Sequence, residues 1–491
     1  MNNSWYKYSI SLFLLVVLFP IATKGQEKGL IFSKYYSPKD YFAGTQNWVI
    51  TQDKRGVMYI GNGIGVLEFD GENWRKIKVS NESTVRGIDI AENNTIYVGA
   101  YNEIGYLAPD NTGELIYNSL VPYIDSSYKD FGEVWSTNCM SDTVFFLTER
   151  YLIRYLNGKF DYWESNSERF YLGHKVDNKY LVHEIGNGLL EFKDNNLQLI
   201  EGGSFFANKR IHSIINFNGK TIIGTRNNGI FIITETETGN KIESLSEISE
   251  KTKELNEYLI KDILYHGIKL SDNLLAFGTI KGNVLIVDSE WNVKDIINNE
   301  VIGIKSPVQY LYNAPNQALW IGLANGLCEV ETLSPFRYWN DKKGLIGSFT
   351  DVAELDKKLY ISTGSGVYYT SRDAQNTKFE ISSFIPVQGN FEQVWGFLYF
   401  QPPEANADKI ISNRITDKNT LLLASTSKGI FQIIDDKSRL ISENRSVYTI
   451  YQYKKDPSKL FLGTTNGVAL VEYNNNNWIQ KGFKFGIKDI I

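Results

Sequence analysis

The chain has 491 residues, more than one hydrophobic core usually serves, so two domains or an array of repeats are expected. Apolar residues make up 42% and charged residues 22%, which excludes a disordered chain, and 40 glycines against 11 prolines with 14% aromatic residues favour strands and tight turns. The formal net charge is −5 and no cluster of lysine or arginine is present, so binding to nucleic acid is not expected.

The first residues predict export from the cytoplasm. Lys7 precedes an apolar run over residues 10–19, and Pro20 and small residues lead to Gly25. This layout predicts a secretory signal peptide at residues 1–25, and the run is too short to be a comfortable membrane span. The alternative is an uncleaved membrane anchor, which would be the only tether of the chain to a membrane. We therefore expect a periplasmic or otherwise extracytoplasmic protein.

One pattern recurs ten times along the rest of the chain. An apolar run, a turn containing glycine and a second apolar run begin near residues 57, 95, 143, 179, 220, 274, 318, 358, 421 and 459, as in "VMYIGNGIGVLEFD" and "KLFLGTTNGVALVEY". Each copy predicts a β-hairpin, with one strand expected before it and a short strand often following. Four strands at a period near 40 to 50 residues predict the blades of a β-propeller.

Ten blades exceed the four to eight that usually close a propeller, so the chain must be divided. The segment "TLSPFRYWNDKKGLIGS", at 332–348, interrupts the strand pattern. We predict an all-β chain with a seven-bladed β-propeller at 26–334 and a partial second β-propeller of about three blades at 335–491. Since three blades cannot close a ring, the sequence is expected to be the front part of a longer protein. The segment 244–263 has a nearly helical period and is expected to be an excursion from one blade.

The sequence contains no pattern typical of a catalytic site. It lacks H-E-x-x-H, G-x-S-x-G, a phosphate loop and paired C-x-x-C, so we predict no enzyme and no cofactor. His174 and His183 would meet across a hairpin as metal ligands, but structural roles are the preferred interpretation for all four histidines, including His212 and His266, and no metal site is predicted. Cys139 and Cys328 are expected to be buried side chains.

The start of each innermost strand offers a better candidate site. The second residue of that strand occupies the same place in seven successive blades, where its side chain would lie at one mouth of the central channel. This predicts a ligand-binding ring of Trp48, Arg86, Trp135, Tyr171, His212, Lys261 and Gln309. Aromatic rings stack on sugar faces and polar groups hold a charged group. The alternative is that these residues only cap the channel.

Three stretches resemble a known family. "YSPKDYFAGTQNWVITQDKRGVMYIGNGIGVLEFDGENWRKI", "LWIGLANGL" and "SPFRYWNDKKGLIGS" are similar to the two-component regulator propeller proteins of Bacteroidota, which include triple-tyrosine-motif regulators and the sensor halves of hybrid two-component systems. In that family two propellers precede a small β-sandwich, one membrane helix and a cytoplasmic output domain. The resemblance implies the sensory part of a regulator of signal transduction and transcription, with glycan ligands and a homodimer formed through C-terminal parts that this sequence lacks.

These observations predict a non-catalytic sensor module that perceives a carbohydrate or another small ligand and lacks its output domain. Two alternatives stay open. The first is a secreted propeller enzyme that acts on polysaccharides, and the second is a platform for protein interaction.

Overall fold

A computed structural model describes residues 29–237, 239–371, 383–403, 420–444 and 446–486. The signal peptide predicted at 1–25 lies outside the described residues. The chain is an all-β protein with ten four-stranded antiparallel sheets, as the sequence predicts. Its contacts divide it into two compact units, which are described separately below: Leu30–Tyr338, and the part from Trp339 onward. Among the described helices, none combines the length and apolar composition needed to cross a membrane.

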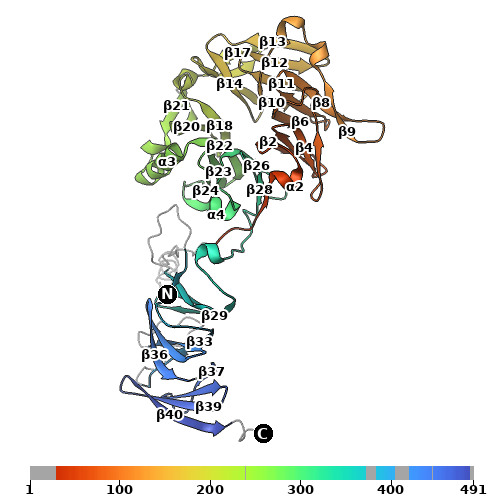
Figure 1. The fold of residues 1–491 in the computed structure, drawn as a ribbon. Helices are drawn as coiled ribbons and strands as arrows, with labels where there is room; N and C mark the ends of the chain where they lie inside the picture. Colours follow the sequence, from red (N-terminus) through yellow and green to blue (C-terminus); the bar gives the residue numbers. More distant parts are fainter. Residues whose placement is uncertain (1–28, 238, 372–382, 404–419, 445, 487–491) are drawn as a thin grey trace, which may run out of the picture. The chain divides into compact units, whose positions relative to one another are not determined.

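The unit Leu30–Tyr338 contains seven sheets that follow one another in chain order, from red to teal in Figure 1. The first sheet contains β2 (Asn47–Gln52), β3 (Met58–Asn62), β4 (Gly65–Phe69) and β5 (Trp74–Ile77), and the second contains β6 (Val85–Ile90), β7 (Ile96–Ala100), β8 (Glu103–Pro109) and β9 (Leu115–Ser119). The third sheet contains β10 (Val134–Met140), β11 (Thr143–Thr148), β12 (Tyr151–Leu156) and β13 (Lys159–Glu164). The fourth contains β14 (Arg169–Val176), β15 (Lys179–Ile185), β16 (Gly188–Lys193) and β17 (Asn196–Leu199). The other three are β18 (Ile211–Phe217), β19 (Lys220–Thr225), β20 (Gly229–Thr236) and β21 (Gly239–Ser244); β22 (Leu264–Ser271), β23 (Leu274–Thr279), β24 (Val284–Asp288) and β25 (Val293–Ile297); and β26 (Val308–Asn313), β27 (Leu319–Leu323), β28 (Leu327–Val330) and β1 (Ser33–Tyr36).

The first strand of the unit closes the ring. β1 supplies the fourth strand of the last sheet by pairing with β28, with Ser33 opposite Val330 and Tyr36 opposite Leu327. The innermost strands of successive sheets contact one another, and β26 contacts β2, so the seven sheets form a closed propeller. Its core lies between neighbouring sheets: one cluster joins Ile50 and Leu67 of the first sheet to Trp320 of the last. The sequence predicts a closed seven-bladed ring, but it did not predict that β1 completes the last sheet.

The repeated glycine of the second strand permits the sheets to approach one another. A Cβ atom on Gly61 would lie 2.6 Å from the carbonyl oxygen of Val85 in the next sheet, and one on Gly99 would lie 2.4 Å from Cγ1 of Val134. A Cβ atom on Gly278 would lie 2.5 Å from Cγ1 of Val308. Real Cβ atoms do not approach other atoms so closely, so this glycine of the repeat marks the place where the next innermost strand packs. The turn glycine has a different role, because Gly65 has φ +129°.

Replacing Gly61 by alanine should lower the free energy of unfolding by about 1–3 kcal/mol, because the added methyl group overlaps the backbone of the next sheet. Gly63→Ala in the same hairpin is the matched control, since a Cβ atom on Gly63 would meet no other atom within 4 Å. Urea unfolding of the two variants measures the difference. Equal stabilities would show that the glycine is not required for packing.

Each innermost strand carries a β-bulge near its start, and β22 has a second irregularity between Lys269 and Ser271. In β2 the pairing with β3 skips the residue between Asn47 and Val49, and in β6 it skips the residue between Val85 and Gly87. The same shift occurs in the innermost strands of all the other sheets, in both units. A bulge turns the skipped side chain away from the ladder, so the fold directs one residue per sheet in the same way.

The described helices are short, apart from one excursion between the fifth and sixth sheets. They are α2 (Pro38–Tyr41), α3 (Glu250–Asp262) and α4 (Asn299–Ile302), with the 3₁₀ turns η1 (Val121–Tyr123), η2 (Ser126–Tyr128), η3 (Gly203–Phe206), η4 (Leu245–Glu247) and η5 (Asp341–Lys343). α3 confirms the helical excursion expected at 244–263. The innermost strand that was predicted to contain Lys261 begins later than expected, because α3 continues to Asp262 and β22 begins at Leu264.

The second unit contains three sheets of the same kind. They are β29 (Phe349–Leu355), β30 (Lys358–Thr363), β31 (Gly366–Ser371) and β32 (Ile385–Pro386); β33 (Val394–Phe400), β34 (Leu421–Thr426), β35 (Gly429–Ile434) and β36 (Lys437–Glu443); and β37 (Val447–Gln452), β38 (Lys459–Thr464), β39 (Gly467–Asn474) and β40 (Asn477–Gly486). β29 contacts β33, and β33 contacts β37, so these sheets follow the arrangement of the first unit. The repeat count predicts these three sheets, and their membership of a partial second propeller stays a prediction.

Candidate functional site

The bulges gather most of the predicted ring around one cavity. Six of the seven predicted residues line a cavity of about 660 Å³ in the unit Leu30–Tyr338, namely Trp48, Arg86, Trp135, Tyr171, His212 and Gln309. Each is the residue that the pairing skips in its innermost strand. The backbone therefore helps to form the ring, because each bulge turns the side chain of the skipped residue out of its ladder.

The placement predicted for Lys261 is wrong. Lys261 is an exposed residue of α3, and it does not line the cavity. The equivalent residue of the sixth sheet is Tyr265, which the bulge of β22 places between Leu264 and His266 and which does line the cavity. The ring therefore contains the phenol of Tyr265 where the sequence predicted the ammonium group of Lys261.

Three residues from successive sheets form a layered group on one side of the ring. The guanidinium carbon of Arg86 lies 3.6 Å from the ring centroid of Trp48 and 4.8 Å from that of Trp135. Nε of Arg86 also lies 3.1 Å from Oε1 of Glu133, and the two side chains are 18% and 20% exposed. Burial is the main cause that raises the pKa of Glu133, while Arg86 opposes the shift. The group presents two indole rings held apart by a positive charge.

The next three sheets contribute a wall of phenol and imidazole rings. The hydroxyl of Tyr171 is 2.9 Å from Nε2 of His212, and the ring of His212 lies 4.6 Å from that of Tyr265. His212 is only 4% exposed. The cavity thus has aromatic groups on two sides, as stacking against a flat ligand requires.

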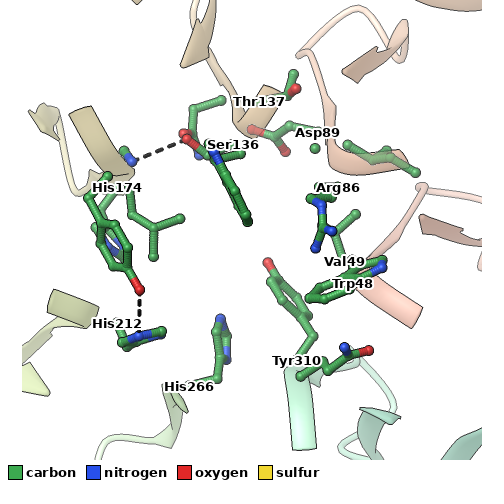
Figure 2. A pocket seen from close by; sticks show the side chains of 18 of the residues that line it. Trp48, Val49, Arg86, Asp89, Ser136, Thr137, His174, His212, His266 and Tyr310 are labelled. Atoms are coloured by element: carbon green, nitrogen blue, oxygen red, sulfur yellow. Dashed lines mark hydrogen bonds between the residues drawn. The ribbon is translucent and has the colours of Figure 1, made fainter. Parts of the chain in front are cut away.

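Residues further along the same strands also line the cavity, among them Asp89, His174 and His266 (Figure 2), and the sequence did not predict them as site residues. Nδ1 of His266 accepts a hydrogen bond of 3.2 Å from the backbone N–H of Leu311, which leaves the proton of a neutral ring on Nε2. Asp89 accepts a hydrogen bond of 2.7 Å from the N–H of Cys139, and burial raises its pKa. Their positions relative to the ring residues could have identified them, because His266 comes directly after Tyr265 and Asp89 is the third residue after Arg86.

Six residues that line the cavity carry a buried polar atom with no hydrogen-bond partner within the described chain. These atoms are Nε1 of Trp48, Nη1 of Arg86, Oγ1 of Thr137, Oδ1 of Asn138, Nε2 of His174 and Oε1 of Gln309. The buried polar groups of folded proteins are nearly always satisfied, so atoms of this kind gathered in one cavity mark it as a place for a polar ligand or for water.

The contacts of His183 give it a structural role. His183 is fully buried, with Nε2 at 3.0 Å from the carbonyl oxygen of Phe206 and Nδ1 accepting from the N–H of Ile211 at 3.5 Å, so both of its nitrogens have structural partners. Among the described residues no group of three or more histidine, cysteine, aspartate or glutamate side chains is placed to hold a metal ion. Cys139 and Cys328 are buried and unpaired, which confirms the expectation from sequence.

All four histidines should stay neutral between pH 5 and 8. Burial lowers the pKa of His174 and His183 to about 4 and of His212 and His266 to about 3. In the unfolded chain a histidine has a pKa near 6.5, so below about pH 6.5 the unfolded state binds more protons and the stability of the fold decreases as the pH is lowered toward 4.

Imidazole NMR signals measure this directly, and the four histidines can be assigned by single replacements. The signals of the folded protein should not shift between pH 5 and 8, whereas those in urea should titrate near pH 6.5. A midpoint above pH 5.5 for any histidine of the folded protein would contradict the burial of that ring.

Comparison with known proteins identifies the fold. No protein-family model matches the sequence, and no curated protein is significantly similar to it. Among solved structures, the chain is similar to an extracellular domain assigned to a hybrid two-component system of B. thetaiotaomicron, with 16% identity and a TM-score of 0.63 over 91% of this chain and 60% of that domain. The chain thus spans less than two thirds of the length of that domain. At the level of fold, this confirms the resemblance inferred from the sequence.

Two further likenesses are weaker. An extracellular domain assigned to a one-component system of B. thetaiotaomicron has 14% identity and a TM-score of 0.44, over 93% of this chain and 61% of that one. Virginiamycin B lyase from Staphylococcus aureus has 12% identity and a TM-score of 0.46, over 61% of this chain and 97% of the lyase. Both TM-scores lie below 0.5, and no conclusion rests on either likeness.

Proposed function

We propose that this chain is a non-catalytic, extracytoplasmic ligand-recognition module of a transmembrane signalling or transcriptional regulator, and that its cavity binds a small carbohydrate. The observation that carries the proposal is the cavity of about 660 Å³, which is lined by one bulge residue from every sheet in the unit Leu30–Tyr338. Its volume is within the range of small-molecule sites.

The chemistry of the lining supports a sugar. The rings of Trp48, Trp135, Tyr171 and Tyr265 offer faces for the C–H groups of a pyranose. Buried atoms without partners, such as Oε1 of Gln309 and Nε1 of Trp48, offer one acceptor and one donor for hydroxyl groups. A site that hydrogen-bonds hydroxyl groups discriminates strongly among ligands, because the wrong ligand leaves those groups unpaired.

Signalling would act through a change in the population of two arrangements. A ligand shifts such an equilibrium only by its difference in affinity for the two states, so the cavity must differ between them. The partner in this scheme is a second copy of the regulator, joined through parts that follow the propellers in the resembled family. The export signal predicted at residues 1–25 supports an extracytoplasmic location.

The test measures thermal unfolding of the chain with cellotriose, maltotriose, xylotriose, mannotriose and trigalacturonate. At least one of these ligands should raise the unfolding temperature, since a ligand at 100 times its Kd adds about 2.7 kcal/mol to stability. Trp135→Ala should abolish the shift and Tyr123→Ala, at a 74% exposed site outside the cavity, should retain it. No shift with any sugar, or an equal shift in both variants, would refute the proposal.

One observation favours a second candidate, an enzyme that cleaves polysaccharides by elimination. The hydroxyl of Tyr171 and Nε2 of His212 lie 2.9 Å apart, and a phenol beside a neutral imidazole can serve as an acid–base pair. The same incubations, followed for an unsaturated or shortened product, separate the two functions. Turnover that is lost in Tyr171→Phe would replace the sensor by the enzyme.

A further inference from the structure

The cavity carries positive charge in a protein whose net charge is negative. The chain has a formal net charge of −5. The residues lining the cavity nevertheless include five cations and two acids: Arg86, Arg169, Lys175, Arg210 and Arg226 against Asp89 and Glu149. A concave site lined by one sign of charge concentrates ligands of the opposite sign.

Two of these arginines are not neutralised by a neighbouring acid. Arg86 pairs with Glu133, and Arg169 pairs with Glu149 at 3.1 Å. Within the described ranges, no ion pair is formed by Arg210 or by Arg226. Asp89 is not the acidic partner of either arginine: its carboxylate accepts hydrogen bonds from the backbone N–H groups of Cys139 and Ile90.

Arg210 and Arg226 lie together beside the aromatic wall. The backbone N–H of Arg226 donates to the carbonyl oxygen of Arg210 at 2.9 Å, so the two residues are neighbours although they flank different strands. The guanidinium carbon of Arg210 is 6.0 Å from the ring centroid of Tyr171. Burial raises the pKa of Tyr171, and the charges of Arg210 and Arg226 oppose that shift, as expected for guanidinium groups close to the phenol.

A second observation favours a sugar over a simple anion. Gln309 is 7% exposed and its Oε1 has no partner, and Thr137 is 4% exposed and its Oγ1 has no partner. Both residues line the same cavity. An amide oxygen accepts from hydroxyl groups and does not bind an inorganic anion, so the cavity offers acceptors and cations to one ligand.

We propose that the cavity binds an acidic sugar, with a uronate carboxylate at Arg210 and Arg226 and the pyranose ring against the wall of Tyr171 and Tyr265. The inference rests on the proposed function and names its ligand class. Arginine suits a carboxylate because its planar group donates two parallel hydrogen bonds.

The experiment compares trigalacturonate with its fully methyl-esterified form by isothermal titration calorimetry on the full chain. The two ligands share the same sugar rings and differ in charge. Trigalacturonate should bind at least tenfold more tightly at low salt, and the difference should shrink in 0.5 M NaCl because salt screens the interaction. Inorganic sulfate is the third probe and should compete weakly, since it cannot use the aromatic wall.

Arg226→Gln should reduce the affinity for trigalacturonate at least tenfold and leave that for the methyl ester unchanged. Arg55→Gln is the matched control, because Arg55 is 68% exposed in its side chain and does not line the cavity. Unfolding temperatures check that both variants are folded. If Arg226→Gln does not fold, the affinities of the unchanged chain for trigalacturonate and for its methyl ester still test the inference.

Equal affinities for the acid and its ester would overturn the inference, and so would Arg226→Gln that binds trigalacturonate normally. Competition by sulfate as strong as that by trigalacturonate would mean that the site holds anions only, which also overturns it. A neutral sugar that binds through Trp135 while trigalacturonate does not would refute the ligand class and leave the proposed function intact. No binding of any sugar would refute both.

Discussion

Replacing Tyr36 by alanine is expected to lower the free energy of unfolding of the unit Leu30–Tyr338 by about 3–5 kcal/mol, the usual cost of removing a large buried aromatic side chain. Tyr36 is 6% exposed and is the last residue of β1. Its ring stacks on Trp320 at 5.5 Å and meets Phe69 edge to face at 5.5 Å. The residue therefore joins the closing strand to both the first and the last sheet.

The effect should be cooperative, because β1 is the only strand of the last sheet that comes from the start of the unit. Loss of this contact weakens the closure itself, and the neighbouring edges of the ring become exposed to solvent. Urea unfolding followed by tryptophan fluorescence measures the change, since Trp74 and Trp320 both belong to this cluster.

Two controls separate the ring of Tyr36 from its hydroxyl. Tyr36→Phe loses only the hydrogen bond of 3.3 Å to Oε2 of Glu329 and should cost about 1 kcal/mol. Tyr123→Ala removes a tyrosine that is 74% exposed and should leave stability nearly unchanged. A loss below 1 kcal/mol for Tyr36→Ala would show that β1 does not hold the ring closed.

Arg86→Met is expected to cost about 2 kcal/mol of stability and to abolish sugar binding. Methionine keeps the apolar contact with Trp48 and Trp135 but removes the charge, which leaves the carboxylate of Glu133 largely buried without a counter-charge. Fully buried pairs lose about 3–5 kcal/mol when one partner is removed, and the remaining exposure of this pair reduces that figure.

The pH dependence of this loss has a definite sign. Without Arg86 the pKa of Glu133 rises further above its value in the unfolded chain, so the folded state holds the proton longer. A carboxyl whose folded pKa is raised removes stability as the pH rises above about 4.3. The difference between Arg86→Met and the unchanged chain should therefore be larger at pH 8 than at pH 5.

The double variant Arg86→Met with Glu133→Gln tests the explanation. It should recover most of the lost stability, because no buried charge is left unpaired, and it should still fail to bind sugar. Recovery of binding together with stability would show that Arg86 serves only to hold the fold.

The sequence predicted the ring residues well where strand and bulge coincide with a simple local pattern. An apolar residue precedes six of the seven predicted residues, as Val85 precedes Arg86 and Val308 precedes Gln309; Trp48, which follows Asn47, is the exception. The sixth strand failed because Ile260, Ile263 and Leu264 fit both a strand and the end of a helix. The helix prevails because Ser249 caps α3 and Ile263 ends it with φ +62°.

Other parts of the site had no local signal. Arg210 precedes β18 and Arg226 follows β19, so only the pairing of these two strands brings them together. The closing strand β1 has four residues, and Tyr36 bonds to Glu329 across 293 positions of sequence. Such contacts depend on the completed ring and are not encoded in any short stretch of the chain.

The closing strand also dictates the order of assembly during biosynthesis. A chain that leaves the ribosome amino terminus first exposes β1 long before β28 is made, so β1 cannot pair with β28 until then. Contacts this distant in sequence make folding slow. The last sheet is completed only after residue 330 has emerged, and a translocation machine or chaperone that holds the early segment extended until then would keep it from pairing with another chain.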